Sequence, residues 1–507
     1  MNKESKTIKL ALPKVVFDII EKIKTNGFQA YIVGGCLRDL ILGRDVYDWD
    51  ITTSCKPEQI RKLFDKSIYE NTFGTVGVIT GSSENNSKIV EVTTYRLESN
   101  YLDKRHPENI KFADNLNDDL MRRDFTINAM AFDILKSKVL KTKVNVEGNI
   151  IDLYDGVDDL NKKLIRAVRE PKDRFNEDAL RMVRAIRFST QLGFQIEKNT
   201  FEALKSLAKN IKFVSSERIR DEFIKMIMSE NAVLGIQQLE TSGIMEYIIP
   251  ELINCIGVGQ NMHHIYTVYE HLVRSLDYAV KNDYSLEVRL AALFHDIGKP
   301  RVKKGNGKFS TFYNHEMESA KITKKILERL KFPNYIMDKV VLLVRHHQFY
   351  YDPEVNTDSS IRYLITNVKK ENILELSQLR EADRIGSGCP KALPFRLRHF
   401  LFRVEKVLNE MENKNLSLKT LKIDGADLMK ELKMKPGPAM GFVLNILLSE
   451  IINDLKLNTK KYLISRAKEL VEKTESQLKK ESDNSKKVFE KMKTLEEDKI
   501  KEKHGIR

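Results

Sequence analysis

The chain has 507 residues, enough for three or four domains at roughly 150 residues each. Its four cysteines are scattered without a Cys-x-x-Cys pair, which argues against a disulfide-stapled fold and a cysteine zinc site and predicts a reducing cytoplasm. We expect neither a signal peptide nor a membrane segment, because no apolar run approaches the ~20 residues that span a bilayer. The net charge of +14 fits a polyanionic partner but is weak evidence alone.

The first informative feature is a pair of glycines. An apolar stretch at residues 30–33 ends at Gly34 and Gly35, and residues 36–42 have a helical pattern, so the glycines stand where a strand passes into a helix. Glycines let a phosphate approach the backbone, and the free N–H groups of a helix start favour an anion. Arg38 is expected to project beside this site from the first turn.

Two aspartates follow shortly after. Asp48 and Asp50 flank Trp49 in a segment that continues as a strand, which places both carboxylates on one face. Their mutual repulsion is relieved by a hard divalent cation, and Mg²⁺ shared with substrate phosphates is the expected one. Together with the glycine pair they indicate nucleotidyl transfer, although each element alone also fits a plain turn or surface charges. Glu91 is a candidate third acidic neighbour, but a solvent-facing charge is the favoured interpretation.

These segments resemble the signature of the class II nucleotidyltransferases of the polymerase-beta superfamily, which are the tRNA CCA-adding enzymes and bacterial poly(A) polymerases. Further matching motifs occur in the same order, and the resemblance covers most of the chain. They are Glu-Val-Thr-Thr-Tyr-Arg at 91–96, Arg-Arg-Asp at 122–124, Asp-Gly at 155–156 and Glu-Asp-Ala-Leu-Arg at 177–181.

The resemblance implies site residues and partners. Asp48 and Asp50 are expected to be catalytic and to bind Mg²⁺, with CTP, ATP and the 3′ end of tRNA as substrates. Arg122 precedes one of the implied nucleotide-binding residues and is expected to help neutralise the triphosphate. The residues implied to bind the nucleotide are Gly34, Gly35, Arg38, Arg123, Asp178, Arg181, Arg184 and Arg187.

Asp178 and Arg181 predict how bases are selected. Residues 176–192 have the pattern of one helix, so the i, i+3 spacing places these two side chains on one face. Cytosine and adenine both present an exocyclic amino donor beside a ring-nitrogen acceptor, which an Asp acceptor beside an Arg donor matches. Uracil and guanine reverse that pattern. In the resembling family these motif positions pair with the incoming base.

Seven of the ten histidines lie between residues 263 and 347. Within this segment, Ala-Ala-Leu-Phe-His-Asp-Ile-Gly-Lys at 291–299 resembles the core of the HD phosphohydrolase superfamily. Imidazoles and carboxylates bind divalent transition metals, which lower the pKa of a bound water for attack on phosphorus. A degenerate HD fold that serves only as a spacer is the alternative. The implied metal ligands are His271, His295, Asp296 and Asp383, with His315 and His346 as candidates for a second metal.

The expected fold is an α/β N-terminal head with a small mixed sheet, followed by mostly α-helical neck, HD, body and tail domains. Residues 100–119 are polar and show little periodicity, which predicts a long loop. Lys433 and Lys435, beside a turn rich in glycine and proline, are candidates to hold RNA phosphates. The expected ranges are 1–157 for the head, 158–235 for the neck, 236–390 for the HD domain, 391–470 for the body and tail, and 471–507 for a charged helical or disordered end.

The predicted activity is addition of CCA to the tRNA 3′ end from CTP and ATP without a nucleic-acid template, with a secondary HD phosphohydrolase activity. Two alternatives stay open. A bacterial poly(A) polymerase shares the catalytic core, and an HD phosphohydrolase with an RNA-binding head belongs to another class. These motifs specify neither the oligomeric state nor the substrate and metal of the HD domain.

Overall fold

The computed structural model of the chain describes residues 6–70, 74–82, 87–98, 110–140, 143–261, 265–388, 395–413, 418, 421–453 and 455–506. The chain forms two compact units, Met1–Val344 and Arg345–Arg507. The boundary falls inside the range predicted for the HD domain. Within the described part, none of the helices combines the length and the apolar character that crossing a bilayer requires.

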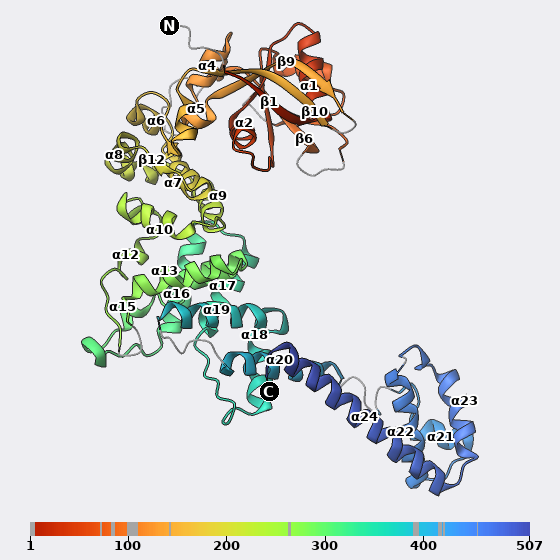
Figure 1. Cartoon of the computed structure of the whole chain (residues 1–507). Coiled ribbons are helices and arrows are strands. Elements are labelled where there is room, and N and C mark those ends of the chain that lie inside the picture. The colour runs from red at the N-terminus through yellow and green to blue at the C-terminus, as the bar shows by residue number, and fades with distance from the viewer. Residues whose placement is uncertain are drawn as a thin grey trace. The chain divides into compact units, whose positions relative to one another are not determined.

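The strands of the described part of the head form a main sheet, seen in Figure 1, and a separate two-stranded sheet. The strands are β1 (Lys6–Pro13), β2 (Ala30–Val33), β3 (Trp49–Thr53), β4 (Ser67–Glu70), β5 (Thr75–Ile79), β6 (Ile89–Thr94), β7 (Arg96–Glu98), β8 (Ile110–Phe112), β9 (Met130–Val139) and β10 (Lys143–Asp152). The helices are α1 (Lys14–Thr25), α2 (Gly34–Ile41), α3 (Pro57–Leu63), α4 (Leu116–Met121) and α5 (Gly156–Asn161).

The predicted mixed sheet is confirmed, and it has eight strands in the order β1-β10-β9-β2-β3-β6-β5-β4. It is mixed because β3 and β6 run parallel while the other pairs are antiparallel. Alternating apolar residues at 76–80 and 89–94 predict β5 and β6, and the segments at 30–33 and 48–53 predict β2 and β3. The other four strands of this sheet were not predicted. β9 begins with buried residues and ends in a run of exposed ones, so it lacks the alternation of a half-buried strand, whereas β10 alternates buried and exposed residues over most of its length and was overlooked.

The loop predicted at 100–119 is wrong over its second half. β8 pairs with β7 in a separate two-stranded sheet, and α4 follows. Asn115 caps α4 by accepting a hydrogen bond from the Asp118 N–H. Residues 100–109 lie outside the described part of the chain. Short elements of three to six residues leave too little periodicity for detection.

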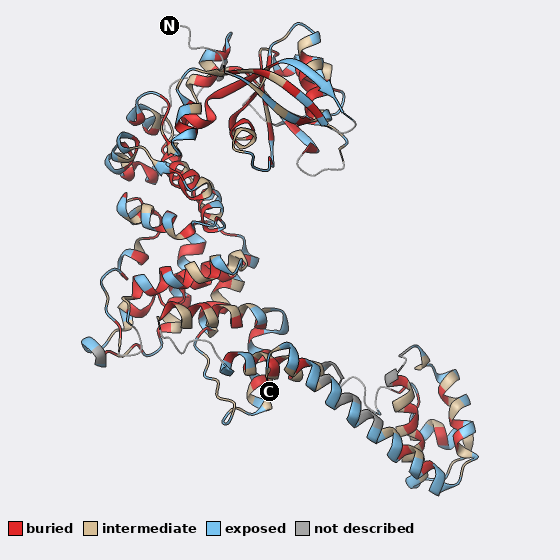
Figure 2. Ribbon diagram, in the orientation of Figure 1, coloured by how far each residue is buried: buried red, intermediate tan, exposed pale blue. Residues whose placement is uncertain are grey.

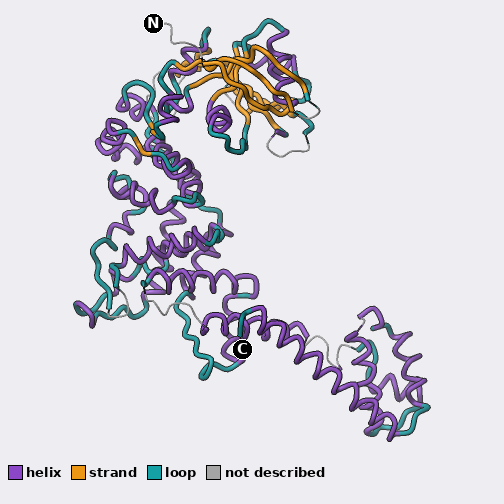
Figure 3. Tube along the Cα trace, viewed as in Figure 1, coloured by secondary structure: helices purple, strands orange, loops and turns teal. Residues whose placement is uncertain are grey.

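The remainder of the first unit is mainly helical, as predicted (Figure 3). Its elements are β11 (Leu164–Ile165), α6 (Pro171–Glu177), α7 (Leu180–Leu192), β12 (Gln195–Ile196), α8 (Lys198–Leu207), α9 (Ser216–Ile227), α10 (Ala232–Thr241), α11 (Met245–Ile248), α12 (Pro250–Ile253), α13 (Val268–Lys281), α14 (Leu286–Phe294), α15 (Lys299–Val302), α16 (His315–Arg329) and α17 (Asn334–His346). Buried side chains line α7 and α14 on most of their surface (Figure 2).

The described part of the second unit is helical. Its helices are α18 (Asp358–Val368), α19 (Ile373–Gly386), α20 (Phe395–Asn413), α21 (Gly425–Leu432), α22 (Pro438–Asn453), α23 (Lys460–Val471) and α24 (Glu475–Lys503). The charged C-terminal stretch, for which the sequence allowed helix or disorder, is helical in α24. Lys406 and Glu497 form an ion pair of 3.2 Å between α20 and α24.

Candidate active site and metal centre

The two glycines lie at the junction of β2 and α2, as predicted. Gly34 has φ of +74°, a left-handed conformation that favours glycine. A Cβ atom added to Gly34 would lie 3.1 Å from both Arg123 Nη1 and Asp50 Oδ2. The backbone at the start of α2 therefore lies directly beside a cation and a carboxylate, and any side chain at this position would crowd them.

Three carboxylates lie close together: Asp48 immediately before β3, Asp50 near the start of β3, and Glu91 on the adjacent strand β6. Trp49 and Ile51 are buried, as strand alternation around the two aspartates predicts, while Asp50 is half-buried and Asp48, immediately before the strand, is exposed. Glu91 on β6 lies directly opposite Asp50 in the parallel register. It is exposed, as the favoured interpretation held, but it is also a neighbour of the aspartates.

The electrostatics of Asp50 show that these groups interact. Burial raises the pKa of Asp50 to about 6, with Glu91 and Asp48 raising it and Arg123 and Arg38 lowering it. Oxygen ligands with this excess of negative charge are the donor set that a hard divalent cation prefers. The residues present therefore fit a metal such as Mg²⁺.

Arg38 and Arg123 are held in place by other side chains. Arg38 donates to both carboxylate oxygens of Asp39, at 2.9 and 2.8 Å, and to Asn128 Oδ1 at 2.9 Å. Arg123 donates to Asp119 Oδ2 at 3.2 Å. Both guanidinium groups are thereby fixed near Asp50 before any ligand arrives.

Asp119 is a residue that the sequence interpretation missed. It is fully buried on α4 and accepts hydrogen bonds from Arg122, Arg123 and Thr52. Burial alone would raise its pKa, but the charges and hydrogen bonds of the two arginines lower the pKa to about 2. The spacing of Asp119 and Arg123, four residues apart, is a signal that could have identified the pair.

Asp178 and Arg181 do not share a helix face, so that expectation was wrong. α6 ends at Glu177, Asp178 has extended backbone, and α7 begins at Leu180. Asp178 Oδ1 accepts a hydrogen bond from the Leu180 N–H at 3.0 Å, the bond by which an aspartate starts a helix. No glycine or proline marks the break, so periodicity alone could not locate it.

These two residues have separate partners in the structure. Asp178 Oδ2 accepts from Arg218 Nη2 at 2.6 Å. Arg181 is buried and donates to Glu177 Oε2 at 2.7 Å and to the carbonyl oxygen of Arg122 at 3.0 Å. The neck thus contacts the Arg122–Arg123 segment through Arg181.

Arg184 and Arg187 lie further along α7. Arg184 donates to Asp124 Oδ2 at 2.8 Å, and Arg187 forms an ion pair with Glu222 of α9. The ring of Phe188 supports both guanidinium groups, with centroid distances of 5.4 Å to Arg184 and 3.8 Å to Arg187. Both charges are therefore compensated within the protein, so a direct role in nucleotide binding stays a prediction.

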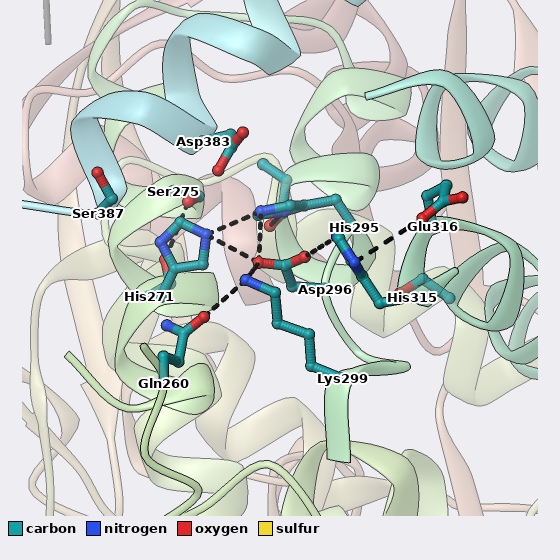
Figure 4. Close-up of polar contacts among 12 residues, drawn as sticks. Gln260, His271, Ser275, His295, Asp296, Lys299, His315, Glu316, Asp383 and Ser387 are labelled. Atoms are coloured by element: carbon teal, nitrogen blue, oxygen red, sulfur yellow. Dashed lines mark hydrogen bonds and ion pairs between the residues drawn. The ribbon is translucent and has the colours of Figure 1, made fainter. Parts of the chain in front are cut away.

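A second cluster surrounds the carboxylate of Asp296, as Figure 4 shows. Its Oδ2 lies 3.2 Å from His271 Nε2 and 2.6 Å from Lys299 Nζ, and its Oδ1 lies 3.1 Å from His315 Nε2. His271 and His295 approach each other at 2.9 Å between their Nε2 atoms. All five side chains are buried.

The hydrogen bonds behind these histidines test whether the cluster fits a metal. His295 Nδ1 lies 2.9 Å from the Ala292 carbonyl oxygen, and His315 Nδ1 lies 2.7 Å from that of Phe312. A carbonyl oxygen only accepts, so in each neutral ring Nδ1 carries the proton and Nε2 presents its lone pair toward Asp296. Lone pairs that converge on a carboxylate are a ligand set for a divalent cation.

Lys299 supplies the nearest positive charge. Burial alone would raise the pKa of Asp296, but the charge of Lys299 holds that pKa well below its ordinary value. Lys299 Nζ also donates to Gln260 Oε1 at 2.6 Å. The sequence interpretation missed both residues, although Lys299 belongs to the segment that carries the HD resemblance.

The remaining predicted metal ligands lie in the second unit. Asp383 on α19 is buried and accepts from Arg380 Nη1 at 2.7 Å. His346 is half-buried, whereas the next residue, His347, is 2% exposed. Burial therefore favours His347 over the predicted His346 as a candidate ligand, and the role of Asp383 stays a prediction.

Comparison with known families finds three matches along the chain. Residues 30–166 match the family described as the poly A polymerase head domain. Residues 193–256 match the probable RNA and SrmB-binding site of polymerase A, and residues 268–387 match the HD domain. The three matches follow the chain in the order of head, neck and HD segment.

Similar proteins cover nearly the whole chain. A CCA-adding enzyme of Ligilactobacillus salivarius is 31% identical over 463 residues, which are 90% of this chain and 97% of that protein. One of Lactococcus lactis is 32% identical over 440 residues, 86% of this chain and 93% of that protein.

Among solved structures, the Bacillus stearothermophilus CCA-adding enzyme in complex with CTP is similar, with a TM-score of 0.57 and 25% identity. The match covers 90% of this chain and 96% of that one. The glycine junction, the carboxylates of the head and the histidine cluster thus occur in a chain that matches these enzymes along their length. The chain belongs to the family of CCA-adding enzymes and bacterial poly(A) polymerases, nucleotidyltransferases of the polymerase-beta superfamily that carry an HD domain.

Proposed function

We propose that the chain adds CCA to the 3′ end of tRNA from CTP and ATP without a nucleic-acid template. The observation that carries this function is the position of Asp50, whose carboxylate lies beside both the Gly34 backbone and Arg123. The groups expected to bind the triphosphate and the carboxylates expected to bind the metal therefore lie beside one another. The similar Bacillus enzyme was solved in complex with CTP, which supports CTP as a substrate of this chain.

The head residues divide the chemistry between them. Asp48 and Asp50 would hold Mg²⁺, which activates the primer 3′-hydroxyl and stabilises the departing pyrophosphate. The N–H groups at the start of α2 bind phosphate oxygens. Arg38 and Arg123, already oriented by carboxylates, neutralise the triphosphate without having to reorganise.

Base selection is assigned to Asp178 and Arg181. In the described structure Asp178 is hydrogen-bonded to Arg218 and Arg181 to Glu177. To bind a base, each side chain must therefore replace this hydrogen bond by one to the base. The Asp acceptor and Arg donor match the edge shared by cytosine and adenine.

The test is incorporation of each of the four nucleotides into tRNA that lacks CCA. Addition of two C residues and one A supports the assignment. A long run of A instead identifies a poly(A) polymerase, the rival within the family. No incorporation at all refutes the nucleotidyltransferase assignment.

A second function rests on the cluster around Asp296. We propose that His271, His295 and Asp296 hold a divalent transition metal and that the HD domain hydrolyses phosphoesters, with 2′,3′-cyclic or 3′ phosphates as the candidate substrates. His315 and Asp383 are proposed further ligands. When bound, the metal would lower the pKa of a water for attack on phosphorus. Lys299, 2.6 Å from Asp296, would neutralise charge on the substrate phosphate.

Metal analysis of the purified protein tests this second function. One equivalent of metal, lost in His295→Ala, and phosphoesterase turnover support it. Metal without turnover supports a structural metal centre. Neither metal nor turnover supports a domain that serves as a spacer between head and tail.

A further inference from the structure

Three isoleucines are exposed on the head sheet. Ile68 on β4, Ile79 on β5 and Ile89 on β6 have exposed fractions of 45%, 39% and 46%. Isoleucine is among the residues most often buried, and a group of exposed apolar side chains marks a surface for a ligand or partner. We call these three residues the isoleucine platform.

The strand register places the platform on the same face as Asp50. Asp50 on β3 pairs with Glu91 on β6. Glu91 in turn pairs with Gly77 on β5, which pairs with Ile68 on β4. Residues opposite one another in neighbouring strands project to the same face of a sheet. Asp50 and Ile68 of the isoleucine platform therefore lie at the two ends of one row of paired residues across the sheet.

The other two isoleucines form the adjacent row. Ile89 pairs with Ile79, two residues from Glu91 and Gly77 on their strands and therefore on the same face. Gly77 has no side chain, and a Cβ there would lie 3.1 Å from Ile89 Cγ2. The side chain of Ile89 therefore lies against the bare backbone between Glu91 and Ile68.

The phosphate-binding groups lie on the other side of Asp50. In the sheet order β3 stands between β2 and β6, and Gly34 follows β2. In phosphoryl and nucleotidyl transfer, the attacking and leaving oxygens are roughly in line across the reacting phosphorus. With the triphosphate on the β2 side of Asp50, the attacking hydroxyl must approach from the β6 side, where the platform is.

We propose that the isoleucine platform binds the 3′-terminal nucleoside of the RNA to be extended. This inference rests on the proposed nucleotidyltransferase function and names the primer side of the same site. The ribose and the base face are the least charged surfaces of an RNA end, and they pack against aliphatic side chains through apolar contact. Lys66, exposed and two residues before Ile68, supplies a positive charge for the preceding phosphate.

The test is the double substitution Ile79→Ser with Ile89→Ser in the full-length protein. The readouts are the KM for a short RNA ending in CC, with ATP saturating, and the Kd of CTP. We expect the KM for RNA to rise roughly tenfold, because two apolar contacts are lost, and the Kd of CTP to stay within about twofold. Ile79→Val with Ile89→Val should retain a KM close to that of the unsubstituted protein.

The matched control is Leu135→Ser with Val139→Ser on β9, where the two side chains are 57% and 56% exposed. It removes a similar apolar surface from the same sheet and should leave both constants unchanged. An unchanged KM for RNA in the Ile79/Ile89 double variant, or an equal loss in the control, would overturn the platform. Absence of incorporation by the unsubstituted protein would instead refute the nucleotidyltransferase assignment.

Discussion

At the scale of single residues, alanine substitutions at Gly34 and Gly43 distinguish two effects of an added side chain. One is backbone strain and the other is crowding of the candidate active site. Both have left-handed backbone, with φ of +74° and +66°. A Cβ on Gly34 would lie 3.1 Å from Arg123 and Asp50, whereas a Cβ on Gly43 would meet no atom within 4 Å. Gly34→Ala and Gly43→Ala should each cost about 1 kcal/mol of folding free energy, measured by denaturant unfolding.

Only Gly34→Ala should also impair catalysis, because its methyl group would displace Arg123 or Asp50 and would cover the N–H groups that we propose bind phosphate. We expect its kcat/KM for CTP to fall by roughly a hundredfold and that of Gly43→Ala to change less than about threefold. Equal activity losses in the two variants would show that strain, and not proximity to Asp50, matters at Gly34.

Asp50→Asn tests the metal ligand while keeping the size of the side chain. The neutral amide is a poor ligand for a hard cation, so incorporation should fall by at least about a hundredfold while tRNA affinity stays unchanged. Asp45→Asn, an exposed position before β3, is the control. Nucleotide incorporation and tRNA binding by filter retention are the measurements, and substantial turnover by Asp50→Asn would contradict the catalytic assignment.

At the scale of elements, Asp119 ties α4 to the two arginines that follow it. Its pKa is about 2 in the folded protein, below an ordinary value near 3.8. A lowered folded-state pKa stabilises the fold above the ordinary value, and the contribution is lost as the pH falls toward 2. Asp119→Asn should therefore cost about 2 kcal/mol at pH 7.

Thermal unfolding from pH 7 down to pH 3 is the measurement. The difference between Asp119→Asn and the unsubstituted protein should shrink below pH 4, because Asp119 then takes up a proton in the unfolded chain while it stays ionised in the folded protein down to about pH 2. Asp114→Asn, exposed and just before α4, should differ little from the unsubstituted protein at every pH. A difference that does not vary with pH would mean that packing, not charge, accounts for the loss.

The break between α6 and α7 bears on nucleotide selection. Asp178 lies in this break and its carboxylate is bonded to Arg218. Asp178→Ala should allow UTP or GTP to compete, since a good bidentate base contact contributes about 1–3 kcal/mol of discrimination. Incorporation of all four nucleotides on tRNA lacking CCA is measured, with the exposed Asp173→Ala as control. Full retention of the preference for CTP and ATP would place selection elsewhere.

At the scale of the whole molecule, the second unit is predicted to hold tRNA. Lys433 and Lys435 lie in the turn between α21 and α22. If both contact phosphates, Lys433→Gln with Lys435→Gln should reduce the slope of log K against log salt by about two, close to one unit for each contact. Lys479→Gln with Lys480→Gln on α24 changes charge equally and is the control. Equal slopes in both variants would show that this turn does not bind RNA.

The sequence by itself determined those features that depend only on residues close together in the chain. Gly34 after an apolar strand, Asp48 and Asp50 around a buried Trp49, and the His-Asp pair at 295–296 were all identified from adjacent residues. Their structure follows from neighbours in the chain, because strand alternation, turn conformation and helix starts depend on a few residues.

Only the tertiary structure decided which distant residues meet. Glu91 lies opposite Asp50 because β6 pairs with β3 in parallel, and a register of strands 41 residues apart leaves no local pattern. The partner of Asp178 is Arg218, 40 residues later and on another helix. The identity of an ion-pair partner depends on packing, since many arginines in this basic chain could have served, and packing brings Arg218 to 2.6 Å from Asp178.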